Sequence, residues 1–351
     1  MKSYVFPGEI EEDIRKINAE EIPYMRTAGF SQTVKECEQM LLELIHCKGG
    51  RVIPYTASGT AAMDAVVTNY VKALGGKAFV IVGGSFGRRW QQLCDYYDVE
   101  NEAFNVDFCK DIDYEAFEAA MEKAQPKVLL CQQHETSTGV LYDLERISAI
   151  CHRHDVRMVV DVISSFLADP LDMDKWGIDI CLTSTQKGLN ISPGLSIVFL
   201  SSKLNDFQFA HNSYYFDFEE NLKNLTRGQT PFSPATTLFL QLHERLKRDV
   251  ALGTDKIVAE VRKRALYFRS LCEKNGWEIP AESKSNCITG FFVHQNGDLL
   301  FTEMIKRGFY IMPGGTPHYF RVSHLGLQTE EDLDDLAANI KEVESSHYDS
   351  I

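Results

Sequence analysis

Residues 157–200, with the sequence RMVVDVISSFLADPLDMDKWGIDICLTSTQKGLNISPGLSIVFL, carry the pattern that decides the fold. Short apolar runs at 156–162, 178–183 and 195–200 predict three β-strands, and the last two are expected to be neighbours in one sheet. Asp161 lies at the end of the first strand and Lys187 follows the second. Because ligands of such sheets collect at the carboxyl ends of the strands, we expect both side chains at that edge.

Further apolar runs precede this stretch and alternate with amphipathic segments. We expect strands at 78–82, 99–104 and 127–131, and helices at 85–97, 113–124 and 144–154, with Asp113 in a capping position. Nearly all-apolar strands separated by amphipathic helices are typical of a mostly parallel sheet that is covered on both faces. The fold class is therefore α/β.

The pattern changes after about residue 240. Residues 238–276 predict one or two long helices. Shorter elements follow, namely strands at 288–293 and 320–323, a helix at 298–307 and an acidic helix from Glu330. We expect an N-terminal arm over 1–15, a large domain over 16–245 and a smaller α+β domain over 246–351.

The 351-residue chain is acidic, with 50 Asp plus Glu against 36 Lys plus Arg and a formal net charge of −14. This balance disfavours a nonspecific hold on nucleic acid or on an anionic membrane, so small molecules and protein surfaces are the expected partners. No apolar stretch reaches the roughly 18 residues of a membrane span, and the start has no basic segment followed by an apolar one. We expect a cytoplasmic protein.

The nine cysteines are scattered and include no C-x-x-C pair. This spacing argues against a zinc ribbon or a redox dithiol, so no metal site is expected. In a chain of this length we expect reduced and mostly buried thiols.

The turn TASGT at 56–60 lies between an apolar run at 52–55 and a helix predicted over 61–74. Free backbone N–H groups, hydroxyls and the positive end of the helix dipole together favour a bound phosphate. The alternative is that Ser58 and Thr60 only cap the helix.

The stretch GGSFG at 83–87 follows a strand and precedes a helix, but it does not match the G-x-G-x-x-G pattern of dinucleotide-binding folds. Phe86 is either a ring at the sheet edge that stacks on a flat ligand or a core residue.

Asp161 and Lys187 are residues of the kinds found in sites where a lysine amine binds a carbonyl compound. An ionised carboxylate at the end of a buried strand is costly unless it meets a cation, such as a protonated ring nitrogen, or several donors. The alternative is that Asp161 caps the next turn. A lysine in a closed pocket loses its preference for the charged form and becomes a usable nucleophile.

The order of these features is specific: a hydroxylated turn, an aromatic residue, Asp161 at a strand end, and Lys187 at 26 residues further on (187 minus 161). In this respect the sequence resembles the class V aminotransferases of fold type I, which use pyridoxal phosphate. The similar stretches are TASGTAAMDA (56–65), GGSFGRRW (83–90), QHETSTGVL (133–141), VVDVISS (159–165), DICLTSTQKGLNISPGLSIVF (179–199) and FRVS (320–323).

The resemblance implies roles for the residues that hold the cofactor. Lys187 would form the aldimine and later move the substrate proton, Asp161 would pair with the pyridine nitrogen, and Phe86 would stack on the ring. The phosphate would be bound by Ser58, Gly59, Thr60 and Gln186. Thr138 would lie near the ring oxygen, with Thr136 as a possible substitute.

The resemblance also implies a shared site. In this family a second subunit completes the phosphate site, and Gln229 and Thr230 stand at the matching positions, which predicts a homodimer. The alternative is that these two residues only turn the chain into the next helix. Arg321 matches the residue that binds the substrate carboxylate, with a surface arginine as the alternative.

The implied activity is transamination from a small amino donor to pyruvate or glyoxylate. We favour 2-aminoethylphosphonate as the donor, with a serine or alanine–glyoxylate transaminase as the alternative. Two departures from the family pattern, Pro7-Gly8-Glu9 and Met25-Arg26, border the substrate entrance. Phe86 and Gln186 replace the histidines of cysteine desulfurases, so a lyase is less expected. The intact Asp161 and Lys187 argue against a non-catalytic protein of the same fold.

Overall fold

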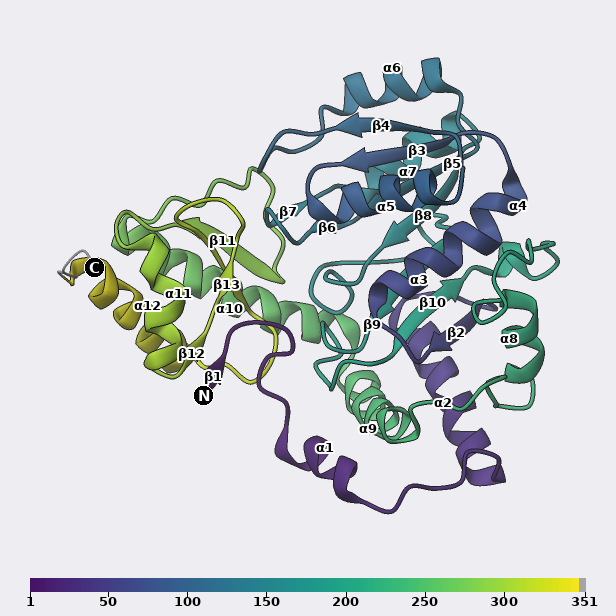
Figure 1. The fold of residues 1–351 in the computed structure, drawn as a ribbon, viewed down its shortest axis with the longest axis horizontal. Helices are drawn as coiled ribbons and strands as arrows, with labels where there is room; N and C mark the ends of the chain where they lie inside the picture. The colour runs from purple at the N-terminus through teal and green to yellow at the C-terminus, as the bar shows by residue number, and fades with distance from the viewer. Residues whose placement is uncertain (347–351) are drawn as a thin grey trace.

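The computed structural model describes residues 1–346, and a seven-stranded sheet organises its larger part (Figure 1). In their order across the sheet, the strands are β2 (Arg51–Tyr55), β10 (Ser196–Leu200), β9 (Ile180–Ser184), β8 (Arg157–Asp161), β5 (Val128–Gln132), β3 (Ala78–Val82) and β4 (Asn101–Asn105). Every neighbouring pair from β9 to β4 is parallel, whereas β10 runs antiparallel to both β9 and β2. The predicted mostly parallel sheet, with β9 and β10 as neighbours, is confirmed.

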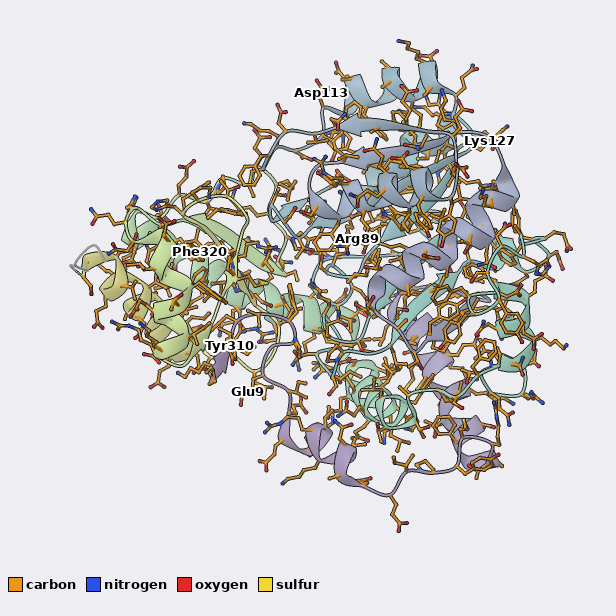
Figure 2. All side chains as sticks on the ribbon, in the orientation of Figure 1. Glu9, Arg89, Asp113, Lys127, Tyr310 and Phe320 are labelled. Atoms are coloured by element: carbon orange, nitrogen blue, oxygen red, sulfur yellow. The ribbon has the colours of Figure 1, made fainter. Side chains whose placement is uncertain are left out.

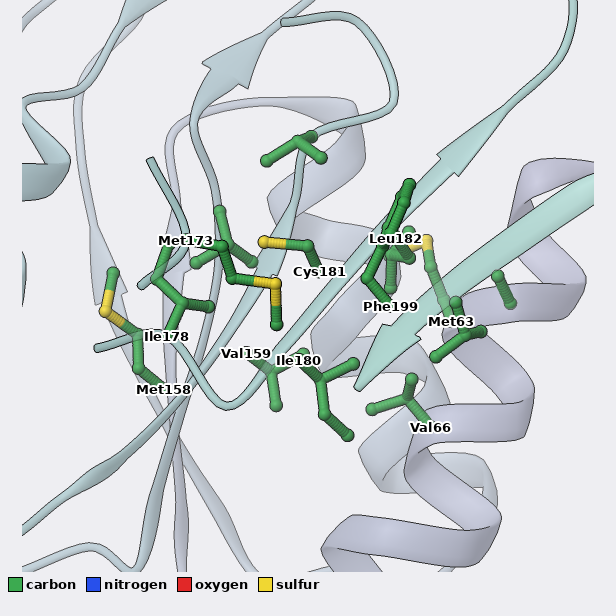
Figure 3. Packing of buried hydrophobic residues seen from close by; sticks show 14 of the residues in the cluster. Met63, Val66, Met158, Val159, Met173, Ile178, Ile180, Cys181, Leu182 and Phe199 are labelled. Carbon is green, nitrogen blue, oxygen red and sulfur yellow. The ribbon is translucent and has the colours of Figure 1, made fainter. Parts of the chain in front are cut away.

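The central strands are covered on both faces. Side chains point alternately to the two faces of a strand, and every residue of β3, β5, β9 and β10 is buried. Helices α3 and α5 contact each other and these strands, while α6 and α7 contact each other together with β4 and β8. Figure 3 shows part of this packing, with Met63 of α3 close to Leu182 and Phe199 of the sheet, and Val66 of α3 beside Ile180.

The helices of the larger part connect the strands or flank the sheet. They are α1 (Glu12–Lys16), α2 (Ala28–Leu44), α3 (Gly59–Val66), α4 (Lys72–Leu74), α5 (Ser85–Tyr96), α6 (Tyr114–Ala124), α7 (Leu144–Arg153), α8 (Phe218–Leu225) and α9 (Thr236–Leu252). A π-helical turn (Val67–Val71) joins α3 to α4, and two 3₁₀ turns span Ile17–Ala19 and Ser202–Leu204. Asp113 and Asp143 cap α6 and α7 by accepting backbone N–H groups of the first turn.

The chain from α10 onward forms the smaller part of the molecule, which has its own sheet and its own apolar core. The three-stranded sheet has the order β11 (Ile288–Phe292), β14 (Tyr319–Ser323) and β13 (Met312–Pro313). Helices α10 (Thr254–Asn275), α11 (Gly297–Lys306) and α12 (Glu330–Ser345) pack around it. Phe268 of α10 and Phe291 of β11 meet edge to face in that core, with ring centroids 5.6 Å apart.

The long segment at 238–276 forms two helices, and Gly253 separates them. Its φ of +84° is a conformation that side chains with a Cβ rarely adopt, so glycine allows α9 to end and α10 to begin at this point. The predicted domain boundary at residue 245 falls inside α9. The division into domains stays a prediction.

The N-terminus lies along the smaller part, as Figure 1 shows. Strand β1 (Lys2–Ser3) pairs in parallel with β12 (Phe309–Tyr310), more than 300 residues away in the sequence. The chain then crosses to α1 beside the larger part. The sequence predicts an arm at this end but not its pairing.

The nine cysteines are all buried, and none forms a disulfide, as the sequence predicts. Within residues 1–346, no helix is long and apolar enough to cross a membrane.

We expect Leu182→Ala to lower the free energy of unfolding by about 2–5 kcal/mol, because this β9 side chain is fully buried and its loss leaves a cavity. Urea denaturation followed by circular dichroism measures the change. Leu266→Ala on α10, where the leucine is 51% exposed, is the control and should shift stability by less than about 0.5 kcal/mol. Equal effects of the two variants would contradict the packing described.

Candidate active site

The loops that carry the predicted site residues meet at one edge of the sheet. Strands β3, β5, β8 and β9 are parallel, so their carboxyl ends lie on the same side. Strand β2 joins them, because β10 runs antiparallel to both of its neighbours. The turn at 56–60 therefore lies at the same edge as Phe86, Asp161 and Lys187.

Asp161 is the last residue of β8 and is 5% exposed. Its Oδ1 accepts the backbone N–H of Ile163 at 2.7 Å. Burial raises the pKa of this carboxyl group to about 7, against the opposing effects of the Ile163 N–H and of the Lys187 and Arg89 charges. An added cation at this position would favour the ionised form.

Lys187 lies in the turn after β9 and is half-buried. Gly188 beside it packs against the backbone of Phe166, since a Cβ at this glycine would lie 1.9 Å from the Phe166 carbonyl oxygen. Burial lowers the pKa of the lysine amine to about 8, and the Asp161 charge partly opposes this shift. A substantial neutral fraction near neutral pH makes the amine a usable nucleophile.

The turn at 56–60 packs closely on the loop after β8. A Cβ at Gly59 would lie 2.6 Å from Cδ1 of Ile163 and 3.3 Å from Oγ of Ser184, so glycine permits this approach. Ser58 is the N-cap residue of α3, yet its exposed hydroxyl makes no capping hydrogen bond there. Thr60 Oγ1 accepts a hydrogen bond from Arg89 at 3.0 Å. The first turn of α3 thus presents hydroxyls beside a guanidinium, which suits an anion.

Arg89, which Figure 2 labels, connects this turn to the predicted stacking residue. Its guanidinium lies 5.0 Å from the centroid of the Phe86 ring while it bonds to Thr60. From the sequence, Arg89 is expected only to solvate or brace the helix start. The structure shows which two residues it joins.

Glu135 fixes the position of Phe86, a role that is not predicted from the sequence. This fully buried carboxylate accepts the backbone N–H groups of Phe86 at 3.3 Å and Gly87 at 3.0 Å, at the N-terminus of α5. Gln132 and Ser137 donate to it as well. A buried acid in the segment QHETSTG, directly after a strand, is the signal that would have indicated it.

The structure distinguishes the two threonines of this segment. Thr138 Oγ1 donates to the Glu135 carbonyl at 3.2 Å, so its hydroxyl belongs to the turn between β6 (His134–Glu135) and β7 (Val140–Leu141). Thr136 is buried with Oγ1 2.6 Å from Oγ of Ser164, on the loop after β8. The position of Thr136 suits a contact with a ligand at Asp161 better than that of Thr138, the residue named first from the sequence.

Arg321 reaches from the smaller part to this edge. Its Nη1 and Nη2 donate at 2.8 Å to the carbonyls of Thr136 and Pro313, while its buried Nε has no partner within residues 1–346. Burial lowers the pKa of its guanidinium from the usual value. The predicted clamp residue is therefore held in place by two of its five N–H groups, and its buried Nε–H has no partner in the described part of the chain.

Contacts within the same subunit hold Gln229 and Thr230 in place. Arg26 donates to Gln229 Oε1 at 3.3 Å and to the Thr230 carbonyl at 2.8 Å, and Thr230 Oγ1 donates to the Phe232 carbonyl. These contacts order the segment before α9. A role in a second subunit stays a prediction, as does phosphate binding by the half-buried Gln186.

Several buried polar atoms near this edge have no hydrogen-bond partner in the described part of the chain. They are both ring nitrogens of His134, Oγ of Ser165, Oγ of Ser184 and Nε of Arg321. Burial is the main reason that the pKa of His134 falls to about 3, and the Lys187 charge adds to it. Since buried polar groups are rarely left unpaired, this set fits a polar ligand such as pyridoxal phosphate.

A comparison with known families identifies the class of protein. The model of the aminotransferase class-V family matches residues 16–212, more than half of the chain. The chain belongs to this family and is a pyridoxal-phosphate-dependent aminotransferase, as the sequence resemblance predicts.

Individual relatives carry different names. The chain is 28% identical over 323 residues to the small subunit of a soluble hydrogenase of Synechococcus sp. (strain PCC 6716), covering 88% of this chain and 83% of that one. It is 25% identical to serine–glyoxylate aminotransferase of Hyphomicrobium methylovorum, with coverages of 92% and 84%. For 2-aminoethylphosphonate–pyruvate transaminase of Pseudomonas aeruginosa (strain UCBPP-PA14) the identity is 27%, with coverages of 85% and 84%.

Among solved structures, an aspartate aminotransferase of subgroup IV from Thermus thermophilus is similar with a TM-score of 0.89 and 23% identity. The match covers 97% of this chain and 98% of that one. The predicted fold, type I of the pyridoxal-phosphate enzymes, is confirmed.

We expect Glu135→Ala to lower the free energy of unfolding by about 2–4 kcal/mol, because it leaves the Phe86 and Gly87 N–H groups buried without an acceptor. Urea denaturation followed by the fluorescence of the three tryptophans, of which Trp90 lies buried on α5, measures this loss. Glu145→Ala removes an exposed partner of Lys175 and should change stability by less than about 0.5 kcal/mol. A similar small loss for both would refute the role of Glu135.

The raised pKa of Asp161 predicts a pH dependence of stability in the cofactor-free protein. A native pKa of about 7 exceeds the unfolded value near 3.8, so the native state holds the extra proton and loses stability as the pH rises through that interval. The stability of Asp161→Asn relative to the unsubstituted protein should therefore grow by on the order of 4 kcal/mol between about pH 4 and pH 8. Urea denaturation at both pH values tests this, and a constant difference would contradict it.

Proposed function

We propose that the chain transfers an amino group from a small donor to pyruvate or glyoxylate, with Lys187 as the group that moves the proton. The observation that carries this proposal is the pair of ionisable groups at one sheet edge whose pKa values are shifted by burial. The pKa of Asp161 is raised to about 7 and that of Lys187 is lowered to about 8. Such shifted pairs are typical of catalytic sites.

Pyridoxal phosphate, when bound, supplies an aldehyde that takes up the amino group and a ring that accepts electrons. The residues proposed to hold it are Asp161 at the ring nitrogen, Phe86 at the ring face and Thr136 near the ring oxygen. Ser58, Gly59 and Thr60 are proposed to bind the phosphate, with Arg89 orienting Thr60 through its hydrogen bond. Gln186 stays a proposed phosphate ligand.

Lys187 accepts and returns the substrate proton at Nζ. A pKa of about 8 places this amine close to the pH at which both of its protonation states are populated, which favours proton transfer in either direction. Asp161 contributes a negative charge that is stabilised by the Ile163 N–H and by a facing cation. Lys187 therefore transfers the proton, whereas Asp161 stabilises the positive charge that faces it.

Two kinds of amino donor are candidates, and a different observation supports each of them. The relatives named for 2-aminoethylphosphonate support this compound as the first donor to test, whereas the segments TASGTAA and STQKG fit either donor. Serine or alanine is the second candidate, and the geometry of Arg321 favours it. Nη1 and Nη2 each donate one N–H to a backbone carbonyl, and the buried Nε has no partner in the described part of the chain, so its N–H is available to a carboxylate, the group that serine and alanine share.

We also propose a cytoplasmic homodimer in which Gln229 and Thr230 complete the partner's phosphate site. The supporting observation is an exposed aromatic group next to this segment. Tyr214 is 89% exposed, and Tyr214 and Tyr215 both contact the Phe232 ring. An apolar patch of this kind is typical of a contact surface.

The proposal predicts the response of the visible spectrum to single donors. Anaerobic addition of 2-aminoethylphosphonate, alanine or serine should bleach the yellow absorbance of the holoenzyme with at least one of them, and pyruvate or glyoxylate should restore it. Lys187→Ala should abolish this cycle while the protein still folds. Bleaching and recovery at normal rates in that variant, or no response of the unsubstituted protein to any small donor, would overturn the proposal.

Arg321→Ala should weaken binding of the keto acid by roughly 10- to 100-fold, since a hydrogen bond to a charged group contributes about 1.5–3 kcal/mol. Steady-state kinetics should show the change in KM more than in kcat. Arg153→Ala removes an arginine that pairs with Glu118 at the surface and should leave both constants unchanged. An unchanged KM for Arg321→Ala would contradict the proposal that Arg321 binds the carboxylate of the keto acid.

A further inference from the structure

The first residues of the chain are fastened to the smaller part. Tyr4 donates its N–H to the Tyr310 carbonyl at 2.9 Å, and its own carbonyl accepts the N–H of Ser323 at 2.8 Å. The Tyr4 side chain is buried, and its hydroxyl donates to the Asp332 carbonyl. The backbone just before Phe6 is therefore held in place by strand-like contacts on both sides.

A second anchor follows immediately after Phe6. Gly8 packs against the backbone of Leu325, since a Cβ there would lie 2.2 Å from the Leu325 carbonyl oxygen. Asn190, three residues after Lys187, donates its side-chain N–H to the Glu9 carbonyl at 2.8 Å. Phe6 thus lies between one anchor on the smaller part and another on the turn that carries the reactive lysine.

The Phe6 ring meets the lysine face on. Nζ of Lys187 lies 3.4 Å from the centroid of this ring. The ring also packs on a buried cluster formed by Ala168, Val261, Cys287, Ile288 and Leu325, which draws on both parts of the molecule. The face of an aromatic ring carries partial negative charge and attracts an ammonium group.

We propose that Phe6 is a positioning residue for Lys187, whose ring face holds the amine at the sheet edge and favours its protonated form. This inference rests on the proposed function, in which the lysine is released and takes up a proton during each turnover. Nothing in the segment YVFPGE indicates which side chain Phe6 contacts, so the sequence alone does not predict this role.

The charged and ionisable groups around Lys187 come from several elements. They are Asp161 at the end of β8, Arg89 on α5, His134 on β6, Cys287 before β11 and Arg321 on β14. Burial and the two arginines disfavour the ammonium form, whereas Cys287 and Asp161 favour it. The Phe6 ring adds a further favourable interaction without adding a charge, so it favours protonation of the amine in a pocket whose burial opposes it.

The test uses the full-length protein after removal of its cofactor, so that the Lys187 amine is free. Competitive labelling with acetic anhydride over a pH series, followed by peptide mass spectrometry, gives the pKa of this one lysine. Phenylalanine at position 6 is replaced by its 4-fluoro, 3,5-difluoro and pentafluoro analogues, which keep the ring shape and progressively weaken its negative face. Phe6→Leu is a second variant that keeps apolar bulk, and Val5→Ala is the matched control on the same segment.

We expect the pKa of Lys187 to fall stepwise along the fluorinated series, by about half a unit to one unit in total, and to fall similarly in Phe6→Leu. The pKa in Val5→Ala should equal that of the unsubstituted protein. Circular dichroism establishes that each variant is folded. A pKa that stays constant across the series would overturn the proposal.

A second measurement separates this proposal from the proposed function. In the holoenzyme, the acid limb of kcat against pH should move to lower pH in Phe6→Leu, in the same direction as the labelling result. If the protein proves to catalyse no transamination, the labelling series still decides whether the ring stabilises the ammonium group. If the labelling pKa shifts and the acid limb does not, Phe6 has no part in turnover and the positioning role is refuted.

Discussion

Burial of two opposite ionisable groups at one edge of a parallel sheet is the constraint on which this structure depends. Asp161 and Lys187 lie at the ends of neighbouring strands, and the apolar strands around them are covered on both faces. Removing water raises the pKa of the acid and lowers that of the amine. The sheet therefore does more than bring the two side chains together, because its burial also gives each of them a pKa near neutrality.

The surrounding contacts fix the positions of the side chains at this edge of the sheet. Glu135 holds the first turn of α5, which carries Phe86, and Arg89 ties the same ring to the hydroxyl of Thr60. Arg321 connects the smaller part to the Thr136 carbonyl. A flat ligand with a phosphate at one end and a reactive carbon at the other needs such fixed points around it, since catalysis depends on groups that are positioned before the reaction.

Much of the fold follows from local sequence patterns. Apolar runs of about five residues set the strands, and side-chain caps such as Asp113 and Asp143 set helix starts, because these signals involve neighbours in the chain. The positions of Asp161 and Lys187 follow from the rule that parallel strands end at a common edge. The contacts of Glu135 and Phe6 do not, because each joins segments separated by 48 or more residues. The choice between Thr136 and Thr138 likewise depends on how one turn folds back on itself.

The most direct test of the account is to locate the cofactor on the chain. Borohydride treatment of the holoenzyme fixes the cofactor to the amine that binds it, and peptide mass spectrometry identifies that residue. We expect a single pyridoxyl label on Lys187 and none on Lys175 or Lys203, the nearest lysines in the sequence. A label on another lysine, with Lys187 unmodified in a protein that binds the cofactor, would contradict it.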